Sequence, residues 1–182
     1  MDDTAFLENY RFLARYNRWC NQRLYDSCEQ LSDEERKRDR GAFFGSIHRT
    51  LNHLVLGDQG WLRRFRQCAH DHRTDIASLD ESVLELPATY TLDQVLYEDW
   101  AALRAKRAQL DAAIEVWLGD LPAGATQWTM RYHNLKGMAR EHPAWQAMTH
   151  FFNHQTHHRG QVTTLLMQAG VDPGVTDAIA LV

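Results

Sequence analysis

Apolar residues recur every three or four positions along four long segments of the chain, which is the spacing of amphipathic helices. The segments span about residues 4–31, 44–68, 91–119 and 143–168. In the first of them the stripe consists of Phe6, Leu7, Tyr10, Leu13, Ala14, Trp19, Leu24 and Tyr25. The pattern predicts four long helices and therefore an all-α fold.

Polar and helix-breaking residues stand where these helices are expected to begin and end. Ser46 is a candidate cap for the second helix, and Thr91, followed closely by acidic and amide residues, is a candidate start for the third. Pro143 suits the first turn of the fourth helix, and Gly170 suits its end. Two further short helical segments are expected, one after Ser32 and one near Asp177.

The connections between the predicted helices are long. Residues 69–91 are polar and lack a sustained period, whereas residues 127–142 alternate polar and apolar positions around a turn at 134–137, which predicts a small β-hairpin. Connections of about 20 residues can cross the length of a bundle and let consecutive helices run parallel. We therefore expect one domain over residues 1–182, a four-helix bundle with crossover connections and a β-hairpin before the fourth long helix.

Composition and charge exclude several classes of protein. The formal net charge is −4, and the densest basic run, ERKRDR, is offset by its own acids, so we expect no nucleic-acid partner. No apolar run reaches the roughly 18 to 20 residues of a membrane span. The acidic start MDDTAFLENY does not resemble a signal peptide. Three cysteines without a CxxC spacing argue against a disulfide framework or a thiolate zinc site, so we expect a cytoplasmic protein without a membrane partner.

Histidines interrupt the apolar stripe of the fourth helix. The stripe is Ala147, Phe151, His154, His158, Val162, Leu165 and Ala169. His154 and His158 are four residues apart, so both imidazoles project from one helix face and have the geometry of a chelating HxxxH pair. The pairs formed by His154 with His150 or with His157 are alternatives, but those two residues lie toward more polar sectors. A non-metal interpretation is also open, in which the histidines face solvent or bond to carboxylates.

A metal site would need another ligand, and the second helix offers two histidines. His48 and His53 are about 140° apart on the helix, so only one of them can face the site. His53 is the better candidate because Gly57 and Gly60 leave room on its side of the helix, whereas His48 lies near the helix start, where we expect solvent. Asp58 is a rival ligand, but we expect it to pair with an arginine.

Two stretches, SIHRTLNHLVLGDQGWLRR and HFFNHQTHHRGQVTTLL, resemble the DinB-like superfamily of metal-binding four-helix bundles, and YNRWCNQRLYD and DPGVTDAIALV extend the resemblance over nearly the whole chain. The resemblance implies an up-down-down-up bundle, frequent homodimers, and a zinc or nickel ion held by His53, His154 and His158. Gln161, one turn past His158, is a candidate neighbour of a metal-bound water.

The resemblance allows two functions. Some relatives are metal-dependent thiol S-transferases and isomerases that use low-molecular-weight bacterial thiols, so a small-molecule substrate or thiol would be the partner. Alternatively, the ion only ties the second and fourth helices together. Residues Gln155, Thr156 and His157 stand where a metalloprotease has its glutamate, which disfavours that class. Residues 132–134 of the hairpin either line the mouth of the pocket or only pack.

Overall fold

The long helices dominate the structure, a computed structural model that describes residues 3–182; the first two residues of the predicted domain lie outside this range. In chain order the elements are α1 (Asp3–Glu29), α2 (Asp33–Lys37), α3 (Ile47–Asp71), α4 (Trp100–Asp120), β1 (Thr129–His133), β2 (Ala139–Pro143) and α5 (Ala144–Gln168). Two 3-10 helices, Ala125–Gln127 and Ala178–Leu181, complete them. The fold is mostly helical with one small sheet, as the pattern predicts.

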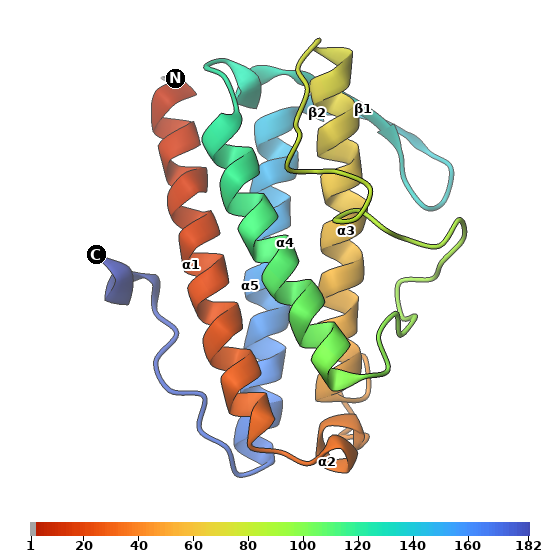
Figure 1. Ribbon diagram of the computed structural model, residues 1–182, viewed down its shortest axis with the longest axis vertical. Coiled ribbons are helices and arrows are strands. Elements are labelled where there is room, and N and C mark those ends of the chain that lie inside the picture. The colour runs from red at the N-terminus through yellow and green to blue at the C-terminus, as the bar shows by residue number, and fades with distance from the viewer. Residues whose placement is uncertain (1–2) are drawn as a thin grey trace.

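The four long helices lie side by side (Figure 1). Helix α1 packs against α4 and α5, and α3 packs against the same two helices. In Figure 1, α1 and α5 run downward whereas α3 and α4 run upward. The segment 72–99 makes this possible, because it returns from the upper end of α3 to the lower end of α4.

Capping side chains set where the helices begin. The hydroxyl of Ser46 accepts a hydrogen bond from the backbone N–H of Arg49 at 3.2 Å, which confirms Ser46 as the cap of α3. The cap of α4 is Asp99, whose carboxylate accepts from the N–H of Ala102 at 2.8 Å.

The predicted start of the third helix at Thr91 is therefore wrong by about two turns. The cause lies in α3, where the Asn52 side-chain oxygen accepts hydrogen bonds from the N–H groups of Leu96 and Tyr97, both at 2.9 Å. Because the Asn52 side chain supplies their hydrogen-bond acceptor, these backbone amides are satisfied without helix formation. A tertiary contact thus overrides the local capping signal.

Residues 129–143 form the predicted hairpin. Strand β1 pairs antiparallel with β2 in a register that runs from Thr129 opposite Pro143 to His133 opposite Ala139. The turn ends at Gly137, which has a φ of 74°, a conformation that favours glycine. The hairpin joins α4 to α5; β1 packs against α3, and the turn extends past α3 on the side away from α1 (Figure 1).

A buried network of charged and amide side chains crosses the middle of the molecule. Arg107 of α4 contacts Asp58 of α3 at 2.6 Å and Asp111 of α4 at 3.0 Å, and all three side chains are almost fully buried. Asn17 and Asn21 of α1 donate to the Asp111 carboxylate at 3.2 and 2.9 Å. The pairing expected for Asp58 is thus confirmed, and its partner is Arg107.

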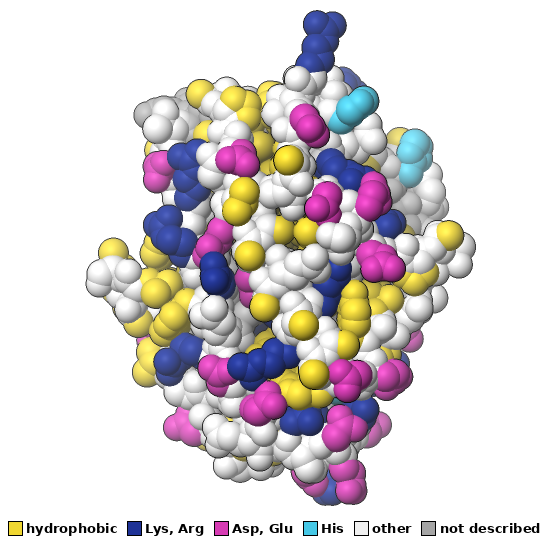
Figure 2. All heavy atoms as spheres, viewed as in Figure 1, with side chains coloured by type: hydrophobic (Ala, Val, Ile, Leu, Met, Phe, Trp, Pro, Cys, Tyr) yellow, Lys and Arg dark blue, Asp and Glu magenta, His cyan; other side chains and the backbone are white. Residues whose placement is uncertain are grey.

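Charges on the molecular surface are mixed. On the face shown in Figure 2, Lys and Arg side chains alternate with Asp and Glu side chains over the helices and the connection. Within residues 3–182, no helix combines the length and the apolar character needed to cross a membrane.

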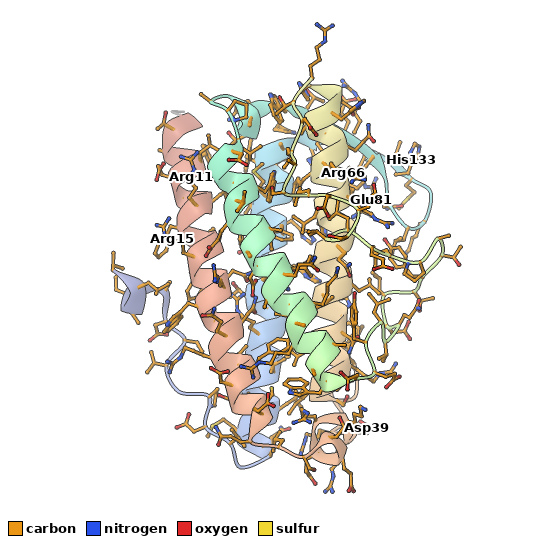
Figure 3. The ribbon with its side chains drawn as sticks, viewed as in Figure 1. Arg11, Arg15, Asp39, Arg66, Glu81 and His133 are labelled. Atoms are coloured by element: carbon orange, nitrogen blue, oxygen red, sulfur yellow. The ribbon has the colours of Figure 1, made fainter. Side chains whose placement is uncertain are left out.

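We predict that Asp58→Ala lowers the free energy of unfolding by about 1–3 kcal/mol, because the buried Arg107 guanidinium would lose the partner of its 2.6 Å hydrogen bond and keep only Asp111. Urea titration followed by circular dichroism measures the change. The control is Glu81→Ala, which removes the exposed 2.7 Å ion pair with Arg66 seen in Figure 3 and should leave stability nearly unchanged. Equal losses in the two variants would contradict a dominant role for the buried pair.

Candidate metal centre

Three histidines meet between α3 and α5. His53 comes from α3, and His154 and His158 come from successive turns of α5. One nitrogen of each ring lies within 4.8 Å of the others. The ring centres are 5.0 Å apart for His53 and His154, 4.5 Å for His53 and His158, and 4.4 Å for His154 and His158. The sequence-predicted triad is therefore assembled in the structure.

Hydrogen bonds at the outer edge of the triad orient two of the rings. His53 donates its Nδ1–H to the backbone carbonyl of Leu92 at 2.8 Å. His158 donates its Nδ1–H to the side-chain oxygen of Gln161, also at 2.8 Å. A neutral imidazole carries one proton, so both rings are left with an unprotonated Nε2 turned toward the centre. This is the arrangement that metal-binding histidines use to fix the ligating nitrogen.

The third ring is placed by a close approach of two helices. A Cβ atom added to Gly57 of α3 would lie 3.0 Å from Cε1 of His154, so a larger residue there would require the ring to shift by a few tenths of an ångström. The Nε2 atoms of His53 and His154 are 3.0 Å apart. Tetrahedral coordination at about 2.0–2.1 Å separates ligand nitrogens by about 3.3 Å, so small ring movements suffice to admit an ion.

Burial keeps the three imidazoles neutral. It lowers the pKa of His154 to about 3, with a further contribution from the neighbouring histidines, and the pKa of His158 to about 4. The pKa of His53 is also lowered by burial, although the hydrogen bond to Leu92 opposes the shift. At neutral pH all three rings thus carry the lone pair that a metal ion requires. The donor set, its orientation and its protonation fit a divalent ion.

An aromatic ring covers the centre from one side. Phe44, just before α3, stacks on His53 with ring centres 4.1 Å apart and lies 5.5 Å from His158. The hydrophobic cover limits access of water and reinforces the lowered pKa values.

Comparison with known proteins agrees with this geometry. The model of the DinB family matches residues 1–181, nearly the whole chain. The chain belongs to the DinB family. It is also similar to Protein DinB of Bacillus subtilis (strain 168), with 25% identity over 183 residues that cover 97% of this chain and 92% of that protein.

The other histidines of this DinB-family chain lie outside the triad. His48 was expected near solvent, but it is buried, with Nε2 2.9 Å from the backbone carbonyl of Tyr97. His150 is exposed and packs beside Trp61 and His154. His157 is also exposed. The α5 pair that meets His53 is therefore His154 with His158, and neither His150 nor His157 takes part.

Two cavities meet at the histidines. The first has a volume of about 380 Å³ and is lined by His53, Leu56, Gly57, Gly60, Trp61, Arg64, Tyr90, Leu92, Asn134, Leu135, Lys136, His150 and His154. The second has a volume of about 600 Å³ and is lined by Phe43, Phe44, Arg49, His53, Leu92, Asp93, His154 and His158. Asn134 thus reaches a pocket mouth, whereas Tyr132 packs on Trp61 and His142.

Two residues that contribute to the centre, Leu92 and Phe44, were not predicted from the sequence. The Leu92 carbonyl acts through the backbone, and its segment carries a helical signal that the structure does not follow. Phe44 looks like an ordinary apolar residue at a helix start. Gly57 gives a partial signal, because a small residue four positions after His53 indicates a close contact on that face.

We predict that Gly57→Ala weakens zinc binding several-fold, because the new methyl group would push the His154 ring a few tenths of an ångström away from α3. Gly60→Ala is the matched control, since its methyl group would meet only the movable Tyr90 hydroxyl, at 3.3 Å. Both changes raise helix propensity equally. Competition titration with a chelating dye measures the affinities, and equal affinity in the two variants would contradict the close-approach constraint.

We also predict that zinc affinity falls less than about tenfold between about pH 7 and about pH 5.5. Three histidines with an ordinary pKa near 6.5 would lose affinity by a factor of roughly 500 over that range, because protons compete for the ligand nitrogens. Lowered pKa values keep the rings unprotonated until the pH is much more acidic. Isothermal titration calorimetry at both pH values distinguishes the two outcomes.

Proposed function

We propose that this DinB-family protein holds a divalent ion, zinc or nickel, on His53, His154 and His158 and uses it as a thiol S-transferase. The observation that supports this proposal is that three neutral imidazoles converge where two cavities meet. The substrates would be a low-molecular-weight bacterial thiol and a small electrophile.

Three protein ligands favour catalysis over a purely structural role. Structural zinc sites are closed by four protein ligands, whereas catalytic sites keep one position for water or substrate. A bound divalent ion would supply Lewis acidity, which lowers the pKa of a thiol or water molecule in the open position. The adjoining cavities provide the space that a thiol and an electrophile require.

The protein's own cysteines are unsuited to act as the nucleophile. Burial raises the pKa of Cys28 to about 12 and that of Cys68 to about 11, and it also raises the pKa of Cys20. All three thiols are buried and remain protonated at neutral pH. A sulfur nucleophile would therefore have to come from a second molecule, which supports the choice of a thiol substrate.

Roles for the residues around the triad follow from their contacts. Leu92 and Gln161 would hold the proton on Nδ1 of His53 and His158 and so keep Nε2 available. Phe44 would exclude water from one side. Gln161 contacts the proposed metal ligand His158, so we propose that its role is to orient the His158 ring.

The proposal includes the architecture that the resemblance implies. The directions of the four long helices support an up-down-down-up four-helix bundle that forms a single domain. We further propose that the protein is cytoplasmic, as its composition led us to expect, and a homodimer, as the family resemblance implies.

The alternative is an ion that stabilises the fold without turnover. The distribution of the ligands over α3 and α5 favours it, because an ion there would tie the two helices together. In that case metal removal would lower the melting temperature and no thiol would be consumed.

We predict that zinc- or nickel-loaded protein accelerates conjugation of a small thiol, such as cysteine, to monochlorobimane, as measured by fluorescence. His154→Ala should lose both the stoichiometric metal and the activity. His70 of α3 is exposed and contacts none of the three histidines, so His70→Ala is the control and should retain both. Tight metal binding without acceleration by any of a panel of low-molecular-weight thiols would instead support the stabilising role.

A further inference from the structure

The smaller cavity beside the histidines has a positive lining. Arg64 of α3 and Lys136 of the hairpin turn both border it, and no aspartate or glutamate is among its lining residues. The second cavity, in contrast, contains both Arg49 and Asp93. The positive character is therefore a local feature, in a chain whose formal net charge is −4.

Arg64 differs from the other arginines of α3. Arg49 donates to the backbone of Asp93, Arg63 to that of Leu84, and Arg66 to that of Leu79. Within residues 3–182 the guanidinium of Arg64 has no hydrogen bond or ion pair. Its five N–H donors are thus left for solvent or a ligand.

Aromatic contacts hold this unpaired guanidinium in place. Its central carbon lies 4.7 Å from the ring centre of Trp61 and 4.9 Å from that of Tyr132. Stacking of this kind leaves the edge donors accessible while it restricts the side chain. A cation that is already positioned loses less conformational freedom when an anion binds.

The floor of the cavity leads from Arg64 to the histidines. His53, Gly57, Gly60 and Arg64 follow one another at helical spacing along the same side of α3. The Cα atoms at the two ends are separated by about 16 Å along the axis, and long side chains lean toward the helix N-terminus, which shortens the gap. The two glycines keep this path open, and a Cβ on Gly57 would lie 3.0 Å from the His154 ring.

We propose that this cavity binds a small organic carboxylate whose anionic end pairs with Arg64 and whose apolar body extends over Gly57 and Gly60 toward His53 and His154. Lys136 adds positive charge at the mouth. The far end of this ligand would lie at the histidines, and that it reacts there rests on the proposed function. In this arrangement Arg64 is the residue that selects anionic substrates.

The walls favour an organic body over an inorganic anion. Trp61, Tyr90, Leu56, Leu92 and Leu135 supply aromatic and apolar surface. A volume of about 380 Å³ falls within the usual range for small-molecule sites. An inorganic phosphate would use the guanidinium but leave this surface without a partner.

The test compares 3-phenylpropionate with its uncharged analogue 3-phenylpropionamide by isothermal titration calorimetry. Zinc-loaded and metal-free protein are both titrated. We expect the carboxylate to bind at least tenfold more tightly than the amide, and more tightly than inorganic phosphate, in both forms. Equal affinity for carboxylate and amide, or for carboxylate and phosphate, would overturn the proposal.

Variants then assign the effect to Arg64. Arg64→Gln should weaken carboxylate binding at least tenfold and leave amide binding unchanged. Arg64→Lys should keep part of the affinity. The control Arg66→Gln makes the same change in net charge two residues away, where the side chain points to Glu81 (Figure 3), and should bind like the wild type. Equal weakening in Arg64→Gln and Arg66→Gln would overturn the assignment.

The two forms of the protein separate this inference from the metal proposal. Carboxylate binding that persists in metal-free protein and depends on Arg64 supports the anion site even if thiol transfer is never observed. Binding that requires zinc and does not depend on Arg64 would place the carboxylate on the ion and overturn the anion site, while the metal centre would stand.

Discussion

Neutralisation of charge in the middle of the molecule is the constraint on which the rest of the structure depends. Asp58 and Asp111 are buried, and Arg107, which contacts both between α3 and α4, balances them together with the buried Arg159 of α5. Asn17 of α1 links this group to the buried Arg159 of α5, whose guanidinium donates to the Asn17 side chain. Breaking such a group leaves buried charged and polar atoms without hydrogen-bond partners, so it restricts how the four long helices can rotate and slide.

The histidine centre is built from residues that are adjacent in sequence to this network. Arg159 directly follows His158, so an arginine fixed toward α1 turns His158 toward α3. Gly57 immediately precedes Asp58 and admits His154 against the α3 backbone. The network and the centre are therefore two consequences of one helix arrangement. Because burial also lowers the pKa values of the three histidines, their arrangement favours an ion over protons.

Periodicity in the sequence predicted the features that depend on a single helix. The inward stripe of α5 identified His154 and His158, and glycines beside His53 indicated a close approach on α3. The start of α4, the burial of His48 and the roles of Leu92 and Phe44 were not predictable in this way. Each depends on a contact across the fold, such as the Asn52 side chain that holds residues 96 and 97. The accessible Arg64 guanidinium is likewise visible only when its neighbours are known.

Anomalous diffraction at the zinc absorption edge, from crystals of zinc-loaded protein, tests the central claim most directly. We expect one strong peak about 2.0–2.1 Å from the Nε2 atoms of His53, His154 and His158. The Nδ1 atoms of His53 and His158 should keep their hydrogen bonds to Leu92 and Gln161. A peak bound by other residues, or no peak between α3 and α5, would contradict the metal centre.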